Sequence, residues 1–164
     1  MSVLALCICL VAAAVTTATA GQQLTCRREI PEELIRELWN QTGVLIDRLP
    51  KEERFSRRTR LLPKFCTKCP ERLIGWLELQ EMIDIYQRSV FSTAAIKKLL
   101  PQHYDELLYR LHHTLQHCVS STGRSKYVKA LKKMERKIKK KREEGAMKAI
   151  REFSFVLRWI DELI

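Results

Sequence analysis

The sequence predicts an all-α fold, a bundle of up to six helices, and three observations support this prediction. Apolar residues recur at steps of three and four over most of the chain, which is the spacing of one helix face. Prolines stand at the borders of these periodic segments. No stretch sustains an alternation of apolar and polar residues, and no Asn-Gly or Asp-Gly pair marks a hairpin, so a sheet is not expected.

The N-terminus predicts a secretory signal peptide. An apolar run over residues 3–15 is followed by the small-residue cleavage motif Ala-Thr-Ala directly before residue 21. This run is shorter than the roughly 20 apolar residues that a transmembrane helix needs. We therefore expect residues 1–20 to be removed, and residues 21–164 to form one secreted, extracellular domain that does not insert into a membrane.

The first helix is predicted between Pro31 and Pro50. Pro31 suits a first helical turn, and Glu32 and Glu33 follow it, where the helix dipole favours negative charge. Its expected apolar face consists of Leu34, Ile35, Leu38, Val44 and Leu45. Residues 51–63 are rich in charge and predict a long connection with room for one short helix.

Two further helices are predicted to begin at prolines, the second from Pro70 to Ser92 and the third from Pro101 to Cys118. The apolar face of the second is expected at Leu73, Trp76, Leu77, Ile83, Tyr86 and Val90. That of the third is expected at Tyr104, Leu107, Leu108, Leu111, Leu115 and Cys118. The polar residues 120–123 predict the end of the third helix.

The C-terminal part of the chain predicts two helices with different surfaces. The fourth, Lys126–Arg142, combines many lysines with a narrow apolar stripe of Val128, Leu131, Met134 or Glu135, and Ile138. Gly145 is expected to break the chain, and residues 146–164 then form a fifth helix. Its core face is expected at Met147, Ile150, Phe153, Val156 or Leu157, Ile160, and Leu163 or Ile164.

Four cysteines remain once the signal peptide is removed: Cys26, Cys66, Cys69 and Cys118. An even number in a secreted chain indicates disulfides, and their spacing leaves all three possible connectivities open. The sequon that begins at Asn40 is consistent with the same compartment and makes Asn40 a candidate glycosylation site.

Three stretches carry a family resemblance. They are Glu81-Met82-Ile83-Asp84-Ile85-Tyr86 with Val90-Phe91, the segment Leu111–Cys118, and Gly145–Phe153. In this order they resemble the interleukin-10 family of helical cytokines, most specifically through Gly-x-x-Lys-Ala-x-x-Glu-Phe followed by an apolar run and Trp159-Ile160. The resemblance covers residues 70–164 and implies a cytokine bundle of up to six helices.

For function, the resemblance implies a secreted cytokine that binds a heterodimeric class II cytokine receptor and triggers Janus kinase and STAT signalling in immune or epithelial defence. It implies receptor contacts on the first helix, the following loop and the last helix. The matching positions are Arg36, Asp47, Arg48, Lys51, Arg54, Arg151, Arg158 and Asp161. Members of the family occur as monomers and as homodimers, and both states stay open for this chain.

The resemblance also implies a disulfide between Cys26 and Cys118, and it leaves Cys66 and Cys69 unexplained. These two form a C-x-x-C motif at the predicted start of the second helix, where a thiol pKa can be lowered. A thioredoxin-type redox protein would need a βαβ context that the sequence does not predict. A local disulfide between Cys66 and Cys69 is the favoured interpretation, and an intermolecular disulfide is the next.

His113 and His117 stand one helical turn apart, which is the spacing of half a zinc site. A third ligand is missing nearby, so a solvated or capping role is favoured over a metal site. The sequence also contains no nucleophile elbow, phosphate loop or glycine-rich nucleotide turn. We therefore expect neither catalysis nor a cofactor.

The lysine-rich fourth helix predicts binding of a polyanion. The chain has a formal net charge of +11, and Glu135 is the one acidic residue between Lys126 and Arg142. Like charges one turn apart destabilise a helix, so a merely solvated helix would mix signs more evenly. The expected contacts are Lys129, Lys132, Lys133, Arg136, Lys137, Lys139, Lys140, Lys141 and Arg142. Heparan sulfate and DNA are the candidate partners, and a cationic host-defence protein acting on nucleic acid or bacterial surfaces is the alternative function.

Overall fold

The computed structural model describes residues 26–51, 58–119 and 125–164. Within these residues the chain is helical and forms no sheet, so the all-α prediction is confirmed at that level. None of the described helices combines the length and the apolar character that a membrane span requires. The predicted signal peptide lies outside the described residues.

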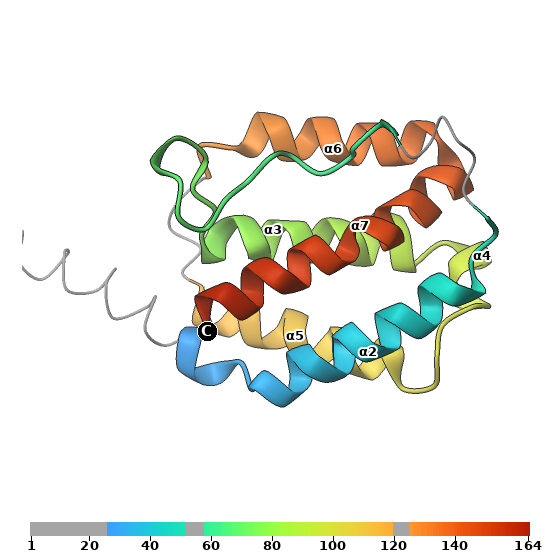
Figure 1. Ribbon diagram of the computed structural model, residues 1–164, viewed down its shortest axis with the longest axis horizontal. Helices are drawn as coiled ribbons and strands as arrows, with labels where there is room; N and C mark the ends of the chain where they lie inside the picture. The colour runs from blue at the N-terminus through green and yellow to red at the C-terminus, as the bar shows by residue number, and fades with distance from the viewer. Residues whose placement is uncertain (1–25, 52–57, 120–124) are drawn as a thin grey trace, which may run out of the picture.

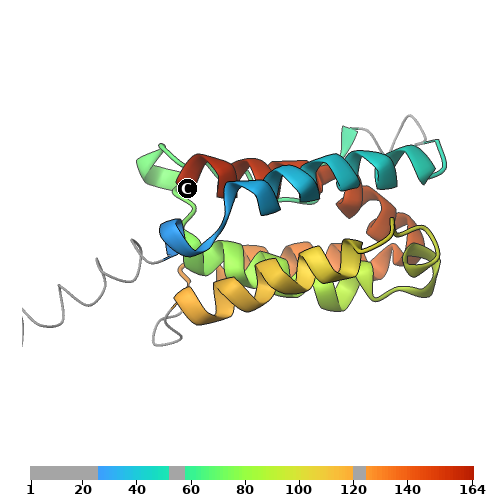
Figure 2. The same ribbon diagram turned by 90° about the horizontal axis from the view of Figure 1, so that it is seen from below.

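The long helices lie in two layers (Figure 1 and, turned by 90°, Figure 2). They are α2 (Glu32–Arg48), α3 (Trp76–Tyr86), α5 (Tyr104–Cys118), α6 (Val128–Lys140) and α7 (Arg142–Leu163). Helices α2 and α7 form one layer and run antiparallel, while α3, α5 and α6 form the other. Helix α7 contacts α2, α3 and α6, which places it at the centre of the bundle.

Helix α2 agrees with the first predicted helix in position but differs in its buried face. Its buried residues are Leu34, Ile35, Leu38, Thr42 and Leu45. Val44, expected in the core, is 42% exposed, and Thr42 takes a core position because it lies one turn after Leu38. The Thr42 hydroxyl forms a buried hydrogen bond of 2.7 Å with the Tyr104 hydroxyl, so its burial leaves no polar group unpaired.

The second predicted helix begins six residues later than expected. Pro70–Arg72 is a short 3-10 helix, η2, and α3 begins only at Trp76. Backbone hydrogen bonds join Cys66 N–H to Arg72 O and Ile74 N–H to Cys66 O, both at 3.0 Å, and they close residues 66–74 into a loop. Leu73, expected on the core face, is therefore 45% exposed.

Beyond Tyr86 the second predicted helix continues as a π-helix, η3 (Gln87–Phe91). A short helix, α4 (Ala94–Lys97), follows, and the periodicity did not predict it. Within residues 51–63, where one short helix was expected, Arg58 is in 3-10 helical conformation and residues 59–63 are not helical. Residues 52–57 lie outside the described part, as do residues 120–124.

Gly145 does not break the chain, because it lies within the first turns of α7. The break falls earlier, at Arg142, whose φ of 52° is in the left-handed region. A Cβ on Gly145 would lie 2.2 Å from the carbonyl oxygen of Ile138. Glycine is therefore needed at this position because it lets α7 approach the backbone of α6.

The core is dense in aromatic rings near the middle of the bundle. Tyr86, Phe91, Tyr104 and Phe153 pack with ring centroids 4.6 to 5.9 Å apart. The Tyr86 hydroxyl donates a 2.7 Å hydrogen bond to Ala149 O, so this buried ring also fixes α3 against α7. Burial raises the pKa of Tyr86 and that of Tyr104 well above the ordinary value of a tyrosine.

Two disulfides are present in the described residues. Cys26 is joined to Cys118 across 92 residues, the pair that the family resemblance implies. Cys66 is joined to Cys69 within the loop that precedes α3. The first fixes the N-terminal segment to the end of α5, and the second closes a small loop at the surface.

Candidate functional site

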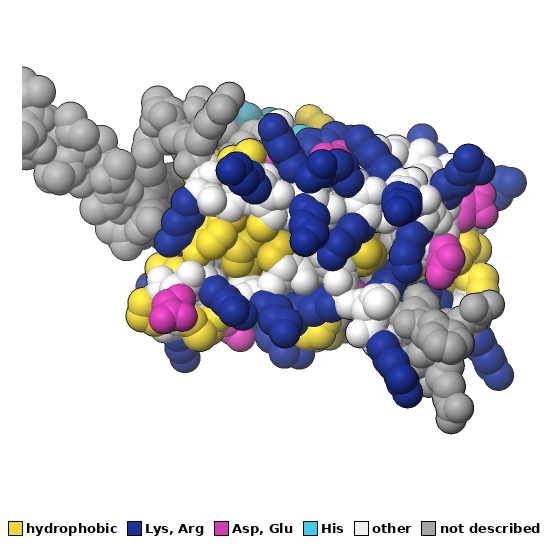
Figure 3. Space-filling model, turned by 90° about the horizontal axis from the view of Figure 1, so that it is seen from above, with side chains coloured by type: hydrophobic (Ala, Val, Ile, Leu, Met, Phe, Trp, Pro, Cys, Tyr) yellow, Lys and Arg dark blue, Asp and Glu magenta, His cyan; other side chains and the backbone are white. Residues whose placement is uncertain are grey.

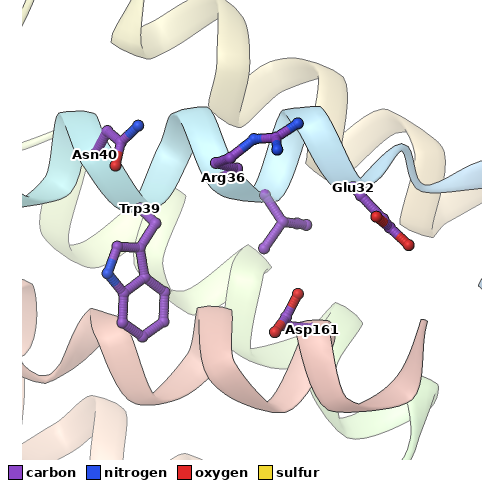
Figure 4. A pocket seen from close by; sticks show the side chains of 6 residues that line it. Glu32, Arg36, Trp39, Asn40 and Asp161 are labelled. Atoms are coloured by element: carbon purple, nitrogen blue, oxygen red, sulfur yellow. The ribbon is translucent and has the colours of Figure 1, made fainter.

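A surface pocket of about 270 Å³ lies between α2 and α7 (Figure 4). It is lined by Glu32, Ile35, Arg36, Trp39, Asn40 and Asp161. The antiparallel arrangement places the first turns of α2 beside the last turns of α7, which is why Asp161 meets residues more than a hundred positions earlier in the chain.

Trp39 is the principal apolar group of this pocket. Its side chain extends from α2 toward α7 and is 40% exposed, although Leu38 beside it is fully buried. Ile35, one turn earlier, is buried at the pocket. Trp39 therefore gives this surface a large, rigid apolar area that the core does not use.

The charges around Trp39 have both signs. Glu32 and Arg36 come from α2 and Asp161 from α7. Arg36 lies 3.7 Å from Glu33, but both side chains are largely exposed, so this ion pair contributes little and leaves the guanidinium accessible. Asn40, the candidate glycosylation site, is exposed on the same surface.

Of the seven predicted receptor residues that the structure describes, Arg36 and Asp161 meet at this pocket. Asp47, Arg48 and Lys51 are exposed near the opposite end of α2. Arg54 lies outside the described residues. The predicted set is therefore spread along the α2 and α7 layer, and it does not form one cluster.

Arg48 and Arg151 each bind a backbone carbonyl near that opposite end. Arg48 donates a 2.9 Å hydrogen bond to Leu99 O, and Arg151 donates to Pro50 O. Arg151, one of the predicted receptor contacts, is half-buried because it reaches across to Pro50, shortly after the end of α2. These contacts give both arginines a structural role at the end of the helix layer.

Arg158 is exposed and stacks on an aromatic ring together with a residue from the long connection. The guanidinium carbons of Arg60 and Arg158 lie 4.7 and 5.6 Å from the centre of the Phe155 ring. Two cations on one ring hold the connection against α7 and bring basic groups from distant parts of the sequence together.

The lysine-rich helix presents its basic side chains to solvent. All nine predicted polyanion contacts are exposed, while Leu131, Met134 and Ile138 bury the opposite stripe of α6. Viewed from the side of α6 (Figure 3), Lys and Arg side chains spread over the face, and Asp and Glu side chains are few.

Glu135, the one acid within this segment, is withdrawn from the basic surface. It is 13% exposed and lies 2.8 Å from Arg88 Nε and 3.2 Å from Lys139 Nζ. Ser89 donates a further 2.7 Å hydrogen bond. The hydrogen bonds from Arg88 above all, with those from Ser89 and Lys139, lower the pKa of Glu135 from 4.5 to about 2. The carboxylate is therefore ionised, and its partners are already bound to it.

A second group of basic residues, which the sequence analysis did not assign, lies on the connection between α2 and α3. Its exposed members are Arg58, Arg60, Lys64 and Lys68. Glu152 fixes this segment by accepting hydrogen bonds of 2.9 to 3.1 Å from the N–H groups of Leu61 and Leu62. Phe65 also anchors it, with ring centroids 4.8 Å from Tyr127 and 5.9 Å from Trp159.

The histidines of α5 do not form a larger cluster. The rings of His113 and His117 stack with centroids 4.1 Å apart, and His117 Nδ1 donates to His113 O at 2.9 Å. His112 instead pairs with Asp84 of α3. Among the described residues no group of three metal-binding side chains comes together.

Two features of these surfaces were missed by sequence reasoning. Trp39 was passed over because it lies beside the apolar stripe of α2, and its position outside that stripe was the available signal. Lys148 and Glu152 were noted only as family motif residues, yet both are buried, with 3.7 Å between Nζ and Oε1. Glu152 is held by the N–H groups of Leu61 and Leu62, a contact between distant parts of the sequence that no local pattern reveals.

Comparison with known proteins identifies no relative: no family model, no curated protein and no solved structure matches this chain.

Proposed function

We propose that this chain is a secreted helical cytokine that binds two chains of a class II cytokine receptor and activates Janus kinase and STAT signalling in immune or epithelial defence. The observation that carries the proposal is the surface shared by α2 and α7, where Trp39 lies among Glu32, Arg36 and Asp161. The sequence resemblance to the interleukin-10 family supports it. Within that family, the basicity and the lysine-rich penultimate helix are most similar to interleukin-26, and the interleukin-10, interleukin-20 and interleukin-22 subgroups are alternatives.

The composition of the α2 and α7 surface suits a protein partner. Energetically dominant interface residues are often Trp, Tyr or Arg placed at the centre of a patch and surrounded by polar groups. Trp39 is already ordered between two helices, so binding would cost little side-chain entropy. Arg36 and Asp161 offer opposite charges for orienting the partner.

The test is binding of the purified chain to a panel of class II receptor ectodomains by surface plasmon resonance. We expect at least one ectodomain to bind, and we expect Trp39→Ala to weaken that binding by about 30-fold, which corresponds to ~2 kcal/mol. STAT phosphorylation in cells carrying the receptor should fall in parallel. Lys97→Ala, an exposed change on α4, is the control and should bind as the unaltered chain does.

Failure of every ectodomain to bind would contradict the cytokine proposal. If an ectodomain binds and Trp39→Ala leaves its affinity unchanged, the chain still has a receptor, but the surface shared by α2 and α7 is not the binding site. Asp161→Ala provides a second, smaller perturbation of the same pocket, and we expect it to weaken binding by a few-fold.

We also propose that the chain binds polyanions, heparan sulfate or DNA, through the exposed lysines of α6. The ion pairs of the half-buried Glu135 support this function in particular, because the one acid in the segment is neutralised by Arg88 and Lys139 and does not oppose an anionic partner. The exposed cations on the connection at residues 58–68 extend the basic area beyond one helix. Direct action on bacterial surfaces, the host-defence alternative, would use the same charges.

Heparin chromatography and DNA fluorescence anisotropy test this second function. Replacing Lys132, Lys133, Lys137 and Lys140 with Gln should lower the salt concentration of elution and reduce the slope of log K against log salt by about 0.9 for each lost contact. A variant with Arg28, Lys97, Lys98 and Arg110 changed to Gln removes the same charge elsewhere and is the control. Equal losses in both variants would mean that net charge alone causes retention.

The second basic group can be tested separately. Arg58, Lys64 and Lys68 changed to Gln should also reduce heparin retention, although less than the α6 variant does. Unchanged retention would restrict the polyanion surface to α6.

A further inference from the structure

The two disulfides differ in both accessibility and loop length. Cys26 and Cys118 are 1% and 3% exposed and stand 92 residues apart. Cys69 is exposed, Cys66 is half-buried, and these two are separated by three positions. A reductant therefore reaches the second disulfide directly, whereas the first is enclosed by the packed core.

We infer that the Cys66–Cys69 disulfide is a thiol–disulfide exchange site for a protein dithiol of the C-x-x-C class, and that it opens while Cys26–Cys118 stays closed. In this role the chain is the substrate of the exchange and the partner is the reductant. The inference does not depend on the receptor or the polyanion proposal.

The geometry assigns a direction to the reaction. Cys69 is the more exposed residue of the pair and is assigned as the point of attack, which makes Cys66 the leaving group. The Lys68 N–H donates to Cys66 Sγ at 3.4 Å, so a donor is already in place for the negative charge that develops on this sulfur. The positive side chain of Lys68, next to Cys69 in the chain, favours the thiolate in the same way. Lys68 is therefore a positioning residue for this step.

The two electrons that reduce the Cys66–Cys69 disulfide come from the partner's dithiol, and no other reductant is needed. Its thiolate attacks Cys69 Sγ, the bond between Cys66 and Cys69 breaks, and the electron pair stays on Cys66, which takes up a proton. The second thiol of the partner loses its proton and attacks the mixed disulfide, which releases the Cys69 thiolate to be protonated in turn. The partner leaves as a disulfide, and both cysteines of this chain are reduced.

Other contacts hold the surrounding residues in place when this disulfide is reduced. Cys66 keeps its two backbone hydrogen bonds to Arg72 and Ile74, and Phe65 remains packed on Tyr127 and Trp159. A cross-link across so short a loop also removes little entropy from the unfolded chain, so its loss costs the fold little.

This loop is connected to the end of α7. Thr67 Oγ1 donates a 2.5 Å hydrogen bond to Glu162 Oε2, and Glu162 follows Asp161 of the α2 and α7 pocket. A reduced, more mobile loop would exchange this hydrogen bond for water more readily. Exchange at Cys66–Cys69 therefore reaches the last turn of α7 through Thr67 and Glu162.

The test uses the purified full-length mature chain with thioredoxin, its reductase and NADPH, followed by acid quenching, alkylation with N-ethylmaleimide and peptide mass mapping. We expect Cys66 and Cys69 to be alkylated about ten-fold faster than Cys26 and Cys118. A thioredoxin lacking its resolving cysteine should be trapped on Cys69. Circular dichroism should show that the helical content of the reduced chain is unchanged.

Several outcomes would overturn the inference. These are opening of Cys26–Cys118 at an equal or higher rate, no alkylation of either pair, and trapping of thioredoxin on Cys66. Lys68→Glu should slow the reduction by about ten-fold, because it places negative charge beside the leaving sulfur. Lys64→Glu, an equal charge change on the same exposed segment, is the matched control, and equal rates for the two variants would remove Lys68 from the mechanism.

Discussion

The two C-terminal helices use charged residues in opposite ways. In α6 the basic side chains face solvent and a narrow stripe of Leu131, Met134 and Ile138 faces the core. In α7 the core face extends around much of the helix and includes a lysine and a glutamate, Lys148 and Glu152, which are buried. The position of each helix causes this difference, because α7 is covered by α2, α3, α6 and the connection at residues 58–68, whereas α6 lies at the edge of its layer.

This comparison indicates which charges serve the fold and which are available to a partner. Glu152 fixes the connection through Leu61 and Leu62, so its charge is structural. The lysines of α6 have no comparable role, apart from the contact of Lys139 with Glu135. Changes to the buried charges should therefore affect stability strongly, and changes to the exposed ones should affect binding.

The largest effect is expected for Glu152→Gln. The change removes the carboxylate from buried Lys148 and weakens the hydrogen bonds to Leu61 and Leu62, so we expect a loss of about 3 to 5 kcal/mol in the free energy of unfolding. Urea denaturation followed by circular dichroism measures it. Lys148→Met and the double variant complete a mutant cycle, in which the double variant should lose less than the sum of the two single losses. Additive losses would show that the two charges do not interact.

Gly145→Ala should have the next largest effect. The added methyl group would lie 2.2 Å from Ile138 O, so α6 and α7 must move apart, and we expect a loss of about 2 kcal/mol despite the better helix propensity of alanine. Ala149→Gly, in the same helix, controls for the propensity change. A Gly145→Ala variant that is more stable than the unaltered chain would contradict the close approach of the two helices.

A smaller, pH-dependent effect is expected at Glu135. Its pKa is lowered to about 2 in the folded chain, so the group stabilises the fold fully above its ordinary value of 4.5 and loses this contribution as pH falls through about 2. Because Arg88 is half exposed, we expect a contribution of about 1 kcal/mol. The difference in unfolding free energy between the unaltered chain and Glu135→Gln should be largest near neutral pH and should shrink below pH 4.5. A difference that stays constant with pH would contradict the ion pair with Arg88.

The smallest effect on stability is expected for the α6 lysines. The variant with Lys132, Lys133, Lys137 and Lys140 changed to Gln should unfold within about 0.5 kcal/mol of the unaltered chain, because the lost side chains are exposed and repel one another. Thermal denaturation with the heparin assay measures stability and binding on the same sample. A large loss of stability would show that these lysines support the fold, as the buried charges of α7 do.

Helix positions were predictable where a segment is long and its apolar spacing regular. The sequence located α2, α5, α6 and α7 to within a few residues, because hydrophobic periodicity is a local property. The start of α3 was wrong because residues 66–74 form a closed loop whose hydrogen bonds the periodicity does not reveal. The break before α7 was also wrong, because a glycine serves close packing as well as chain reversal, and only the neighbouring helix distinguishes these uses.

The candidate sites were predictable to different degrees. The basic residues of α6 could be identified directly, since a run of lysines with a narrow apolar stripe must expose its charge. The pocket around Trp39 could not, because Asp161 reaches it from the far end of the chain. Of the eight predicted receptor residues, Arg36 and Asp161 lie at this pocket, and the receptor role of the whole set stays a prediction.

By itself, the sequence determined the helical class, the border residues of most helices and the concentration of positive charge on α6, because spacing and composition depend on near neighbours in the chain. Only the tertiary structure decided which charges are buried and which disulfide is accessible. It also decided which backbone carbonyls accept hydrogen bonds from Arg48 and Arg151. Each of these depends on contacts between residues that are distant in sequence. The free energy of such contacts depends on burial and geometry, which exist only once the helices have packed together.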